Sequence, residues 1–82
     1  MHAIGNTVKA KNHHERALAI TTEIGDRHTE AICYVNLGTV YHSLGKSVMA
    51  EEYLEKALSK SKDVRDGETE LICYCHLALN KL

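Results

Sequence analysis

The stretch "ICYVNLG" (Ile32–Gly38) returns forty residues later as "ICYCHLA" (Ile72–Ala78). When the 82-residue sequence is shifted by forty positions against itself, fourteen of forty-two aligned pairs are identical, without a gap. The first members of these pairs are His2, Gly5, Val8, Ala10, Glu15, Ala17, Leu18, Asp26, Thr29, Glu30, Ile32, Cys33, Tyr34 and Leu37. A fixed period between about 20 and 50 residues is typical of solenoids and repeat arrays. The sequence therefore predicts repeated structural units.

The composition bounds what these units can be. The chain has the length of one small domain, contains no proline, phenylalanine or tryptophan, and has a net charge of −1. A near-neutral charge gives no sign of binding to nucleic acid or to an anionic membrane. No apolar run approaches the length needed to span a bilayer, and the start, "MHAIGNTVKAK", lacks the apolar core of a signal peptide. The three cysteines form no disulfide framework, so we expect a reducing, cytoplasmic setting.

The apolar periodicity around the repeated stretch is that of a helix over residues 27–44. Tyr34, Leu37, Gly38 and Tyr41 follow one another at i, i+3, i+4 and i+7, which places them on one helix face. Asp26 stands where an N-cap residue belongs, and its copy Asp66 stands at the same place one period later. Gly45 is predicted to end the helix, and Gly5 to end an earlier one, because glycine suits a left-handed residue after a helix.

A second helix is predicted over residues 47–64. Its inner stripe consists of Ala50, Leu54 and Ala57. Its charged residues are predicted to form a solvated outer face: Glu51, Glu52, Glu55, Lys56 and Lys60. Projecting the period along the chain gives four helices, over residues 6–24, 27–44, 47–64 and 67–82, with residues 1–4 as the tail of an earlier helix. Connections of two or three residues make neighbouring helices antiparallel.

These residues resemble a known repeat. A large residue, then Leu-Gly, then Tyr on the first helix, and small–large–small on the second, is similar to the tetratricopeptide repeat (TPR). In this sequence the motif comprises Tyr34, Leu37, Gly38, Tyr41, Ala50, Leu54 and Ala57, which we predict to be the repeat-packing residues. Lys62 stands where the usual proline would be. The forty-residue spacing is similar to the longer repeats of the Pins/LGN-type adaptors and related multi-TPR scaffold proteins.

The resemblance implies an all-α fold, a TPR-type antiparallel helix-turn-helix solenoid fragment of about four helices. We expect residues 1–82 to form a single domain, with a partial repeat over 1–25, a full repeat over 26–65 and a partial repeat over 66–82. A mid-helix glycine costs about 1 kcal/mol relative to alanine. Gly38 therefore indicates close approach of two helices, with Ala50 and Ala57 as its small partners on the facing helix.

The sequence offers few candidates for catalysis or metal binding. Cys73, Cys75 and His76 are the densest cluster of metal-ligand types, but residues two apart on a helix point in different directions. Two ligands on one face fall short of the three or four that zinc requires, so we expect Cys73 and Cys33 to be small core residues. No phosphate-binding loop and no catalytic triad spacing is present. We predict no enzymatic activity, no cofactor and no metal.

The resemblance implies a binding surface on the concave side, because the first helices of TPR arrays line that side and bind partner peptides. The predicted peptide-binding groove consists of Ile32, Val35, Asn36, Thr39, Ser43 and His76. Asn36 matches the position where many peptide-binding TPRs keep an asparagine, whose carboxamide can both donate to and accept from a peptide backbone. The alternative for Asn36 is a solvated helix residue without a binding role. We find no basic residues placed to clamp a peptide carboxylate.

Two functions follow from this sequence. The first is a non-catalytic protein–protein interaction module that binds a partner protein or peptide segment, without nucleic acid or membrane. The alternative is a structural repeat fragment that associates with itself by stacking or swapping terminal helices. We expect either a fragment of a longer array or a chain that completes itself as a homodimer. The terminal apolar residues that would need cover are Val8, Ala17, Leu18 and Ile24 at the start, and Ile72, Leu77 and Leu79 at the end.

Overall fold

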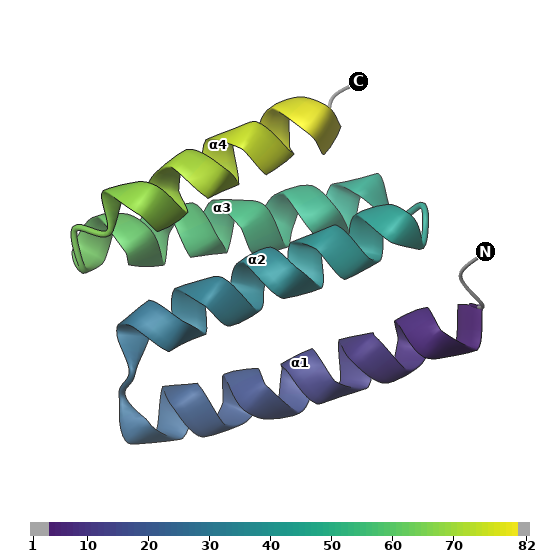
Figure 1. Ribbon diagram of the computed structural model, residues 1–82, viewed down its shortest axis with the longest axis horizontal. Helices are drawn as coiled ribbons and strands as arrows, with labels where there is room; N and C mark the ends of the chain where they lie inside the picture. The colour runs from purple at the N-terminus through teal and green to yellow at the C-terminus, as the bar shows by residue number, and fades with distance from the viewer. Residues whose placement is uncertain (1–3, 81–82) are drawn as a thin grey trace.

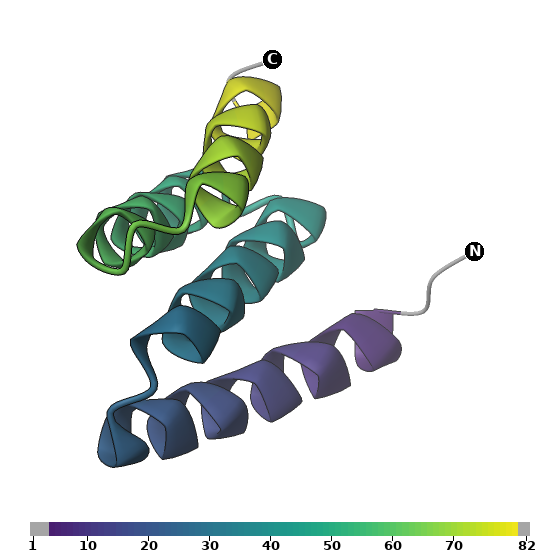
Figure 2. The same cartoon turned by 60° about the vertical axis from the view of Figure 1, so that its left-hand side comes forward.

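The computed structural model describes residues 4–80, with the side chains of residues 7–78. The described chain forms four helices, α1 (Ile4–Ile24), α2 (Arg27–Ser43), α3 (Ser47–Asp63) and α4 (Gly67–Asn80). Each helix packs against the next in an antiparallel stack, with α1 and α4 at its opposite ends (Figure 1). The stack is also seen after rotation, with α1 standing apart from α4 in both views (Figure 2). The predicted all-α fold is confirmed.

The helix boundaries follow the sequence closely except at the start. The predicted ends at residues 44 and 64 are each one residue beyond the observed ends of α2 and α3. The prediction that a helix ends at Gly5 is wrong, because α1 already begins at Ile4 and runs through Gly5. Glycine permits a left-handed turn without requiring one, and inside a helix it costs only about 1 kcal/mol. Residues 1–3 and 81–82 lie outside the described part of the chain.

The turn between α1 and α2 is built by one short hydrogen-bonded motif. Gly25 has a φ of +76°, its N–H donates to the carbonyl of Thr22 (3.3 Å), and the Asp26 N–H donates to the carbonyl of Thr21 (3.0 Å). These bonds define a Schellman motif, which satisfies carbonyls left over at a helix end. The Asp26 carboxylate then accepts from the N–H of Thr29 at 3.1 Å. Asp26 therefore closes α1 and caps α2, which explains the very short connection.

The turn between α3 and α4 repeats this arrangement forty residues later. The Asp66 N–H donates to the carbonyl of Ser61 (2.8 Å), and the Asp66 carboxylate accepts from the N–H of Thr69 (3.2 Å). Arg65 takes the place of Gly25 with a φ of +55°. Gly45, with a φ of +76°, follows α2 as predicted. The predicted capping roles of Asp26 and Asp66 are therefore confirmed.

The core consists of two apolar clusters. One contains Leu37, Tyr41 and Ala50, with Leu18 of α1 packed against it. The other lies among α2, α3 and α4 and contains Val35, Leu54, Ala57 and Cys73, with Tyr34 and Leu77 packed against it. All of the motif residues except Gly38 therefore belong to one cluster or the other. Cys33 and Cys73 are buried, at 4% and 0% exposure.

Gly38 lies at a close approach of α2 and α3. A Cβ atom added to Gly38 would stand 2.8 Å from the Leu54 Cγ and 3.3 Å from the Ala50 carbonyl oxygen. Contacts below 3.0 Å require something to move, so the glycine is needed for this approach. The residues that face Gly38 are Ala50 and Leu54. The expected pair was Ala50 and Ala57, but these two alanines belong to different apolar clusters.

Candidate functional site

A hollow of about 370 Å³ opens between α2 and α4. Its lining residues are Ile32, Val35, Asn36, Thr39, Thr69, Ile72 and His76. Five of the six residues predicted for the groove are therefore brought together. Ser43 is not among them, because it is the last residue of α2, one turn beyond Thr39, and it is exposed there. We call this hollow, with its seven lining residues, the α2–α4 groove.

Thr69 and Ile72 are groove residues that the sequence prediction missed. They are the forty-residue copies of Thr29 and Ile32. Ile32 and Ile72 are exposed to almost the same extent, 39% and 41%, although α2 is an inner helix and α4 a terminal one. The repeat carried the signal for Ile72, because a groove position on one first helix implies the same position on the next, but it carried none for Thr69, because Thr29 does not line the groove. Both isoleucines therefore present apolar surface to the groove in each repeat.

The groove contains no Asp, Glu, Lys or Arg among its lining residues. Its two threonine hydroxyls already donate hydrogen bonds, Thr39 to the Val35 carbonyl at 3.0 Å and Thr69 to the Asp66 carboxylate at 2.6 Å. The polar groups it can offer to a ligand are therefore chiefly the Asn36 carboxamide and the His76 imidazole. A carboxamide matches the donor and acceptor of a peptide unit, and the isoleucines match apolar side chains.

One end of the α2–α4 groove is held by a contact between two repeats. The His28 Nδ1 lies 2.8 Å from an Asp66 carboxylate oxygen, which joins the first turn of α2 to the N-cap of α4. The hydroxyl and N–H of Thr69, with a smaller effect of His28, hold the pKa of Asp66 below its usual value. Comparing the repeats could not have found this contact, because the copy of His28 is Glu68.

Lys60, which is predicted to lie on the solvated outer face of α3, is partly exposed and also contacts a buried carboxylate. The Lys60 Nζ lies 3.8 Å from a carboxylate oxygen of Glu30, a side chain only 7% exposed. The Thr22 hydroxyl donates to the other Glu30 oxygen at 3.2 Å. Glu30 is therefore a buried carboxylate held by groups from α1 and α3, and burial of an acid in this way requires such partners. The sequence prediction considered Lys60 by helix position alone and so missed its partner on α2.

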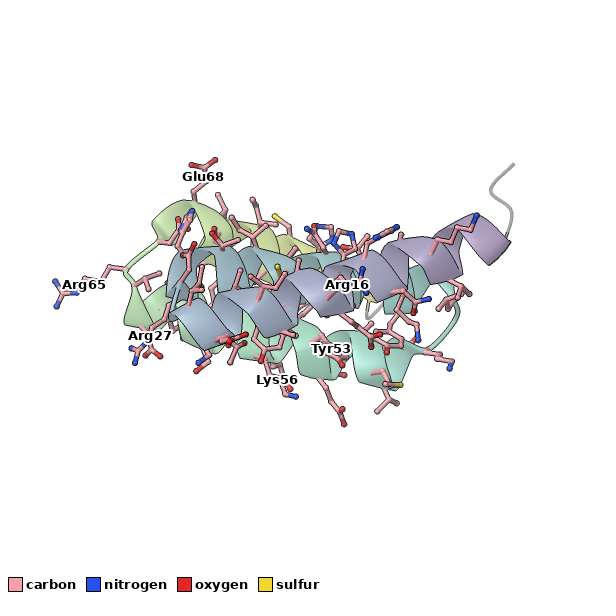
Figure 3. All side chains as sticks on the ribbon, turned by 90° about the horizontal axis from the view of Figure 1, so that it is seen from below. Arg16, Arg27, Tyr53, Lys56, Arg65 and Glu68 are labelled. Atoms are coloured by element: carbon pink, nitrogen blue, oxygen red, sulfur yellow. The ribbon has the colours of Figure 1, made fainter. Side chains whose placement is uncertain are left out.

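Lys56 lies over two tyrosine rings, one on its own helix α3 and one on α2. Its Nζ lies 5.3 Å from the ring centre of Tyr53 and 6.0 Å from that of Tyr34. Tyr53 also stacks on Tyr41, with ring centres 5.2 Å apart and planes 9° from parallel. In Figure 3, Tyr53 and Lys56 lie on the part of α3 that is visible beside α1. Desolvation raises the pKa of Tyr34 and of Tyr53. The contacts of these rings and the lysine hold α2 against α3 at the surface.

The cysteines fall into two environments. Burial, with the Glu70 and Asp66 carboxylates nearby, raises the pKa of Cys73 to about 11, and burial also raises that of Cys33. Such thiols are poor nucleophiles. Cys75 is exposed. Across residues 4–80, no three His, Cys, Asp or Glu side chains are grouped to hold a metal ion, and no helix in that range is long and apolar enough to cross a membrane.

The repeated helix pairs, the interlocking of Gly38 with α3 and the groove between first helices define a helical repeat protein. The family model of the tetratricopeptide repeat matches residues 1–63, which include α1, α2 and α3. The chain belongs to the tetratricopeptide repeat family, whose repeats generally mediate protein–protein interaction. No curated protein and no solved structure matches the chain significantly. The helix α4 lies beyond the matched residues and repeats the sequence of α2.

Proposed function

We propose that this chain is a non-catalytic interaction module that binds a segment of a partner protein in the α2–α4 groove. The observation that carries the proposal is the groove itself, about 370 Å³ in volume and lined by the first helices of two successive repeats, with Ile32 and Ile72 as one corresponding pair and Asn36 and His76 as another. This volume is within the range of about 300–1,000 Å³ that is usual for ligand sites. The family's general role in protein–protein interaction supports the same function.

The groove chemistry favours an uncharged, aliphatic segment. Ile32 and Ile72 lie one repeat apart and leave about two fifths of their surface exposed, so apolar side chains of a partner can bury them. Asn36 follows Ile32 by one turn on the groove side of α2 and can hydrogen-bond one peptide unit. A segment rich in Asp, Glu, Lys or Arg would lose hydration here without gaining an ion pair.

Selection from a library of displayed random peptides tests the proposal. We expect the full chain to enrich neutral peptides with aliphatic residues, and we expect Ile32→Glu to weaken their binding at least tenfold in fluorescence anisotropy. Val48→Glu is the matched control, because Val48 is 73% exposed on α3 and is not part of the groove. Asn36→Ala should weaken binding less than Ile32→Glu. Enriched peptides that bind Ile32→Glu and Val48→Glu equally well would contradict a site in this groove.

The proposed function also includes a scaffold role, a cytoplasmic setting and a division of the chain into repeats. A scaffold role of the kind found in the Pins/LGN-type adaptors is supported by the forty-residue period. A cytoplasmic setting is supported by three unpaired cysteines, two of them buried. The division into a partial repeat over 1–25, a full repeat over 26–65 and a partial repeat over 66–82 follows the same period.

A further inference from the structure

The α2–α4 groove offers a ligand two polar side chains that are not engaged elsewhere. Asn36 and His76 both line the groove, and both are half-buried. Among the described residues, neither side chain has a hydrogen-bond or ion-pair partner. A segment bound in the groove would therefore meet a carboxamide from α2 and an imidazole from α4, each with its hydrogen-bonding groups unused.

These two side chains occupy the same position in successive repeats but differ in whether they can be charged. His76 is the forty-residue copy of Asn36, just as Ile72 is the copy of Ile32. The apolar position is the same in both repeats, whereas the polar position changes from a carboxamide to an imidazole. A carboxamide does not titrate, but histidine ordinarily changes its charge between pH 5 and 8. The second repeat therefore brings a titratable group into the groove.

No residue that lines the groove provides a countercharge for His76. The lining residues of α2 are apolar or neutral, and no residue of α3 is among them. On α4, Cys73 lies one turn before His76, and burial raises the pKa of its thiol to about 11, so that it is uncharged between pH 5 and 8. A protonated His76 would therefore face a ligand as the only charge of the described lining.

The charged groups at the end of the groove are engaged with each other. The His28 Nδ1 and the Thr69 hydroxyl lie 2.8 Å and 2.6 Å from the same carboxylate oxygen of Asp66. Hydrogen bonds from Thr69 hold the pKa of Asp66 below its usual 3.8, so this carboxylate stays ionised down to pH 5. Neither His28 nor Asp66 lines the groove. His28 is nevertheless a second histidine near the groove, and its substitution provides a control for His76.

The groove side of α4 stays open whatever follows that helix in the manner of a repeat. The helix α2 is followed by α3, which packs against it, and yet Ile32 remains 39% exposed and Asn36 half-buried. A helix that packs on α4 as α3 packs on α2 would cover another side of α4. The access of a ligand to His76 therefore does not depend on where the sequence ends.

We propose that His76 sets the charge preference of the α2–α4 groove through its protonation. This inference rests on the proposed function and adds the property by which the groove distinguishes partner segments. With a neutral imidazole, His76 donates or accepts one hydrogen bond, and the groove takes an uncharged aliphatic segment. With a protonated imidazole, the same segment would bury an unpaired charge, which costs free energy. A segment with one carboxylate beside its aliphatic residues then forms a charge-assisted hydrogen bond with His76 instead.

The binding of protons and the binding of a segment are therefore linked, and the segment decides the sign. An uncharged segment binds the neutral imidazole more tightly, so its binding releases protons and weakens as the pH falls. A segment with a carboxylate binds the protonated imidazole more tightly, so its binding takes up protons and strengthens as the pH falls. An exposed aspartate in a peptide stays ionised at pH 5.5, so the segment itself does not titrate in this range.

Peptide affinities at pH 7.5 and pH 5.5 test the proposal. The probes are an uncharged peptide that the full chain enriches from the random library, and the same peptide with a single aspartate placed at each position in turn. We expect the uncharged peptide to bind about three- to tenfold more weakly at pH 5.5. At least one aspartate variant should bind more tightly at pH 5.5 than at pH 7.5. Fluorescence anisotropy measures both affinities.

Two histidine variants separate the groove imidazole from its neighbour. His76→Asn gives both repeats the same side chain at this position and should remove the pH dependence for both kinds of peptide. His28→Asn removes the imidazole that contacts Asp66 but alters no lining residue, so it should keep the pH dependence. Helical circular dichroism at both pH values checks that the variants fold.

Calorimetry in two buffers of different ionisation enthalpy counts the protons that accompany binding. At pH 6.5 the uncharged peptide should release protons and the selected aspartate peptide should take them up, and His76→Asn should abolish both effects. Loss of binding in Ile32→Glu at pH 7.5 places the peptide in the groove independently of these results. If that loss is seen but His76→Asn keeps the pH dependence, or His28→Asn removes it, the proposal for His76 is overturned while the proposed function stands. Peptides that bind Ile32→Glu as well as the unaltered chain would contradict the proposed function, and this inference with it.

Discussion

The helices α2 and α4 are copies of each other in the forty-residue repeat, but different parts of the molecule cover them. Their shared residues are equally placed on two sides. Cys33 and Cys73 are both buried, and Ile32 and Ile72 are both about 40% exposed in the groove. On the remaining side of the helix the two copies differ, because Ala31 is fully buried while its copy Leu71 is 64% exposed.

The difference separates what a repeat determines from what its neighbours determine. A first helix has one side toward the preceding helix, one toward the groove and one toward the following helix. The preceding helix and the groove are supplied for both copies, and there Cys33 and Cys73 agree in burial, as do Ile32 and Ile72, although Cys75 is exposed where Val35 is buried. Among the described residues, α2 is followed by a second helix, α3, and there the chain carries Gly38, whereas α4 carries Ala78 at the same position.

The sharpest test of this comparison places the same leucine in both copies. Gly38→Leu should lower the free energy of unfolding by about 1–3 kcal/mol or more, because its Cβ alone would meet the Leu54 Cγ at 2.8 Å. This cost exceeds the gain of up to about 1 kcal/mol from removing a mid-helix glycine. Ala78→Leu should change the free energy by less than about 0.5 kcal/mol, because Ala78 is exposed.

Denaturant unfolding at low protein concentration measures both variants without interference from association. The exposed Glu52→Ala serves as the neutral control. Equal effects of leucine at positions 38 and 78 would mean that the close approach of α2 and α3 is not what the glycine provides. A large effect at position 78 alone would contradict the exposure of Ala78.

Much of this fold could be predicted because its determinants are local and repeated. The aspartate caps, the turn glycine at position 45 and the helical period each act within a few residues, and each is present in the sequence. The prediction that a helix ends at Gly5 was wrong because glycine occurs both in turns and inside helices. The contacts of Lys60 with Glu30 and of His28 with Asp66 join different helices, and no local pattern marks them.

The groove was predictable to a similar extent and for a similar reason. Ile32, Val35, Asn36 and Thr39 share one face of one helix, so spacing alone groups them. Thr69 and Ile72 come from a second helix; Ile72 could be added by applying the repeat to the groove, whereas Thr69 could not, because its copy Thr29 is not a groove residue. Ser43 satisfies the spacing but is the last residue of α2. The spacing of residues along α2 does not show how far along that helix the groove extends.

The two capping aspartates offer a second comparison, this time in pH. Hydrogen bonds from Thr29 and Thr69 hold the pKa values of Asp26 and Asp66 below the usual 3.8. A carboxyl whose pKa is lower in the folded state stabilises the fold above its unfolded pKa, and this contribution is lost as the pH falls through the folded value. We therefore expect both caps to weaken below about pH 4.

Unfolding midpoints between pH 7 and pH 2 measure this loss. The double variant Asp26→Asn, Asp66→Asn keeps a side-chain acceptor for the caps but cannot titrate. We expect its midpoint to fall less on acidification than that of the unaltered chain. A single Asp66→Asn also replaces the carboxylate that contacts His28, so it should lose more stability at pH 6 than Asp26→Asn. Identical acid profiles for the unaltered and doubly substituted chains would contradict the assigned caps.

The smallest expected effect compares the two residues that end α1 and α3. Gly25 and Arg65 occupy the same place in the same turn, with φ of +76° and +55°. A side chain at such an angle costs about 1–2 kcal/mol, while a glycine costs about 0.4–1 kcal/mol through the entropy of the unfolded chain. Arg65→Gly should therefore stabilise the protein by about 0.5–1 kcal/mol, and Gly25→Ala should destabilise it by a similar amount. A Cβ on Gly25 would meet nothing within 4 Å, so the backbone angle alone is tested there. Figure 3 shows Arg65 extending away from the helices, so its removal costs no visible packing. Thermal and denaturant unfolding measure both variants, and a destabilised Arg65→Gly would show that the arginine makes a contact worth more than the strain it imposes.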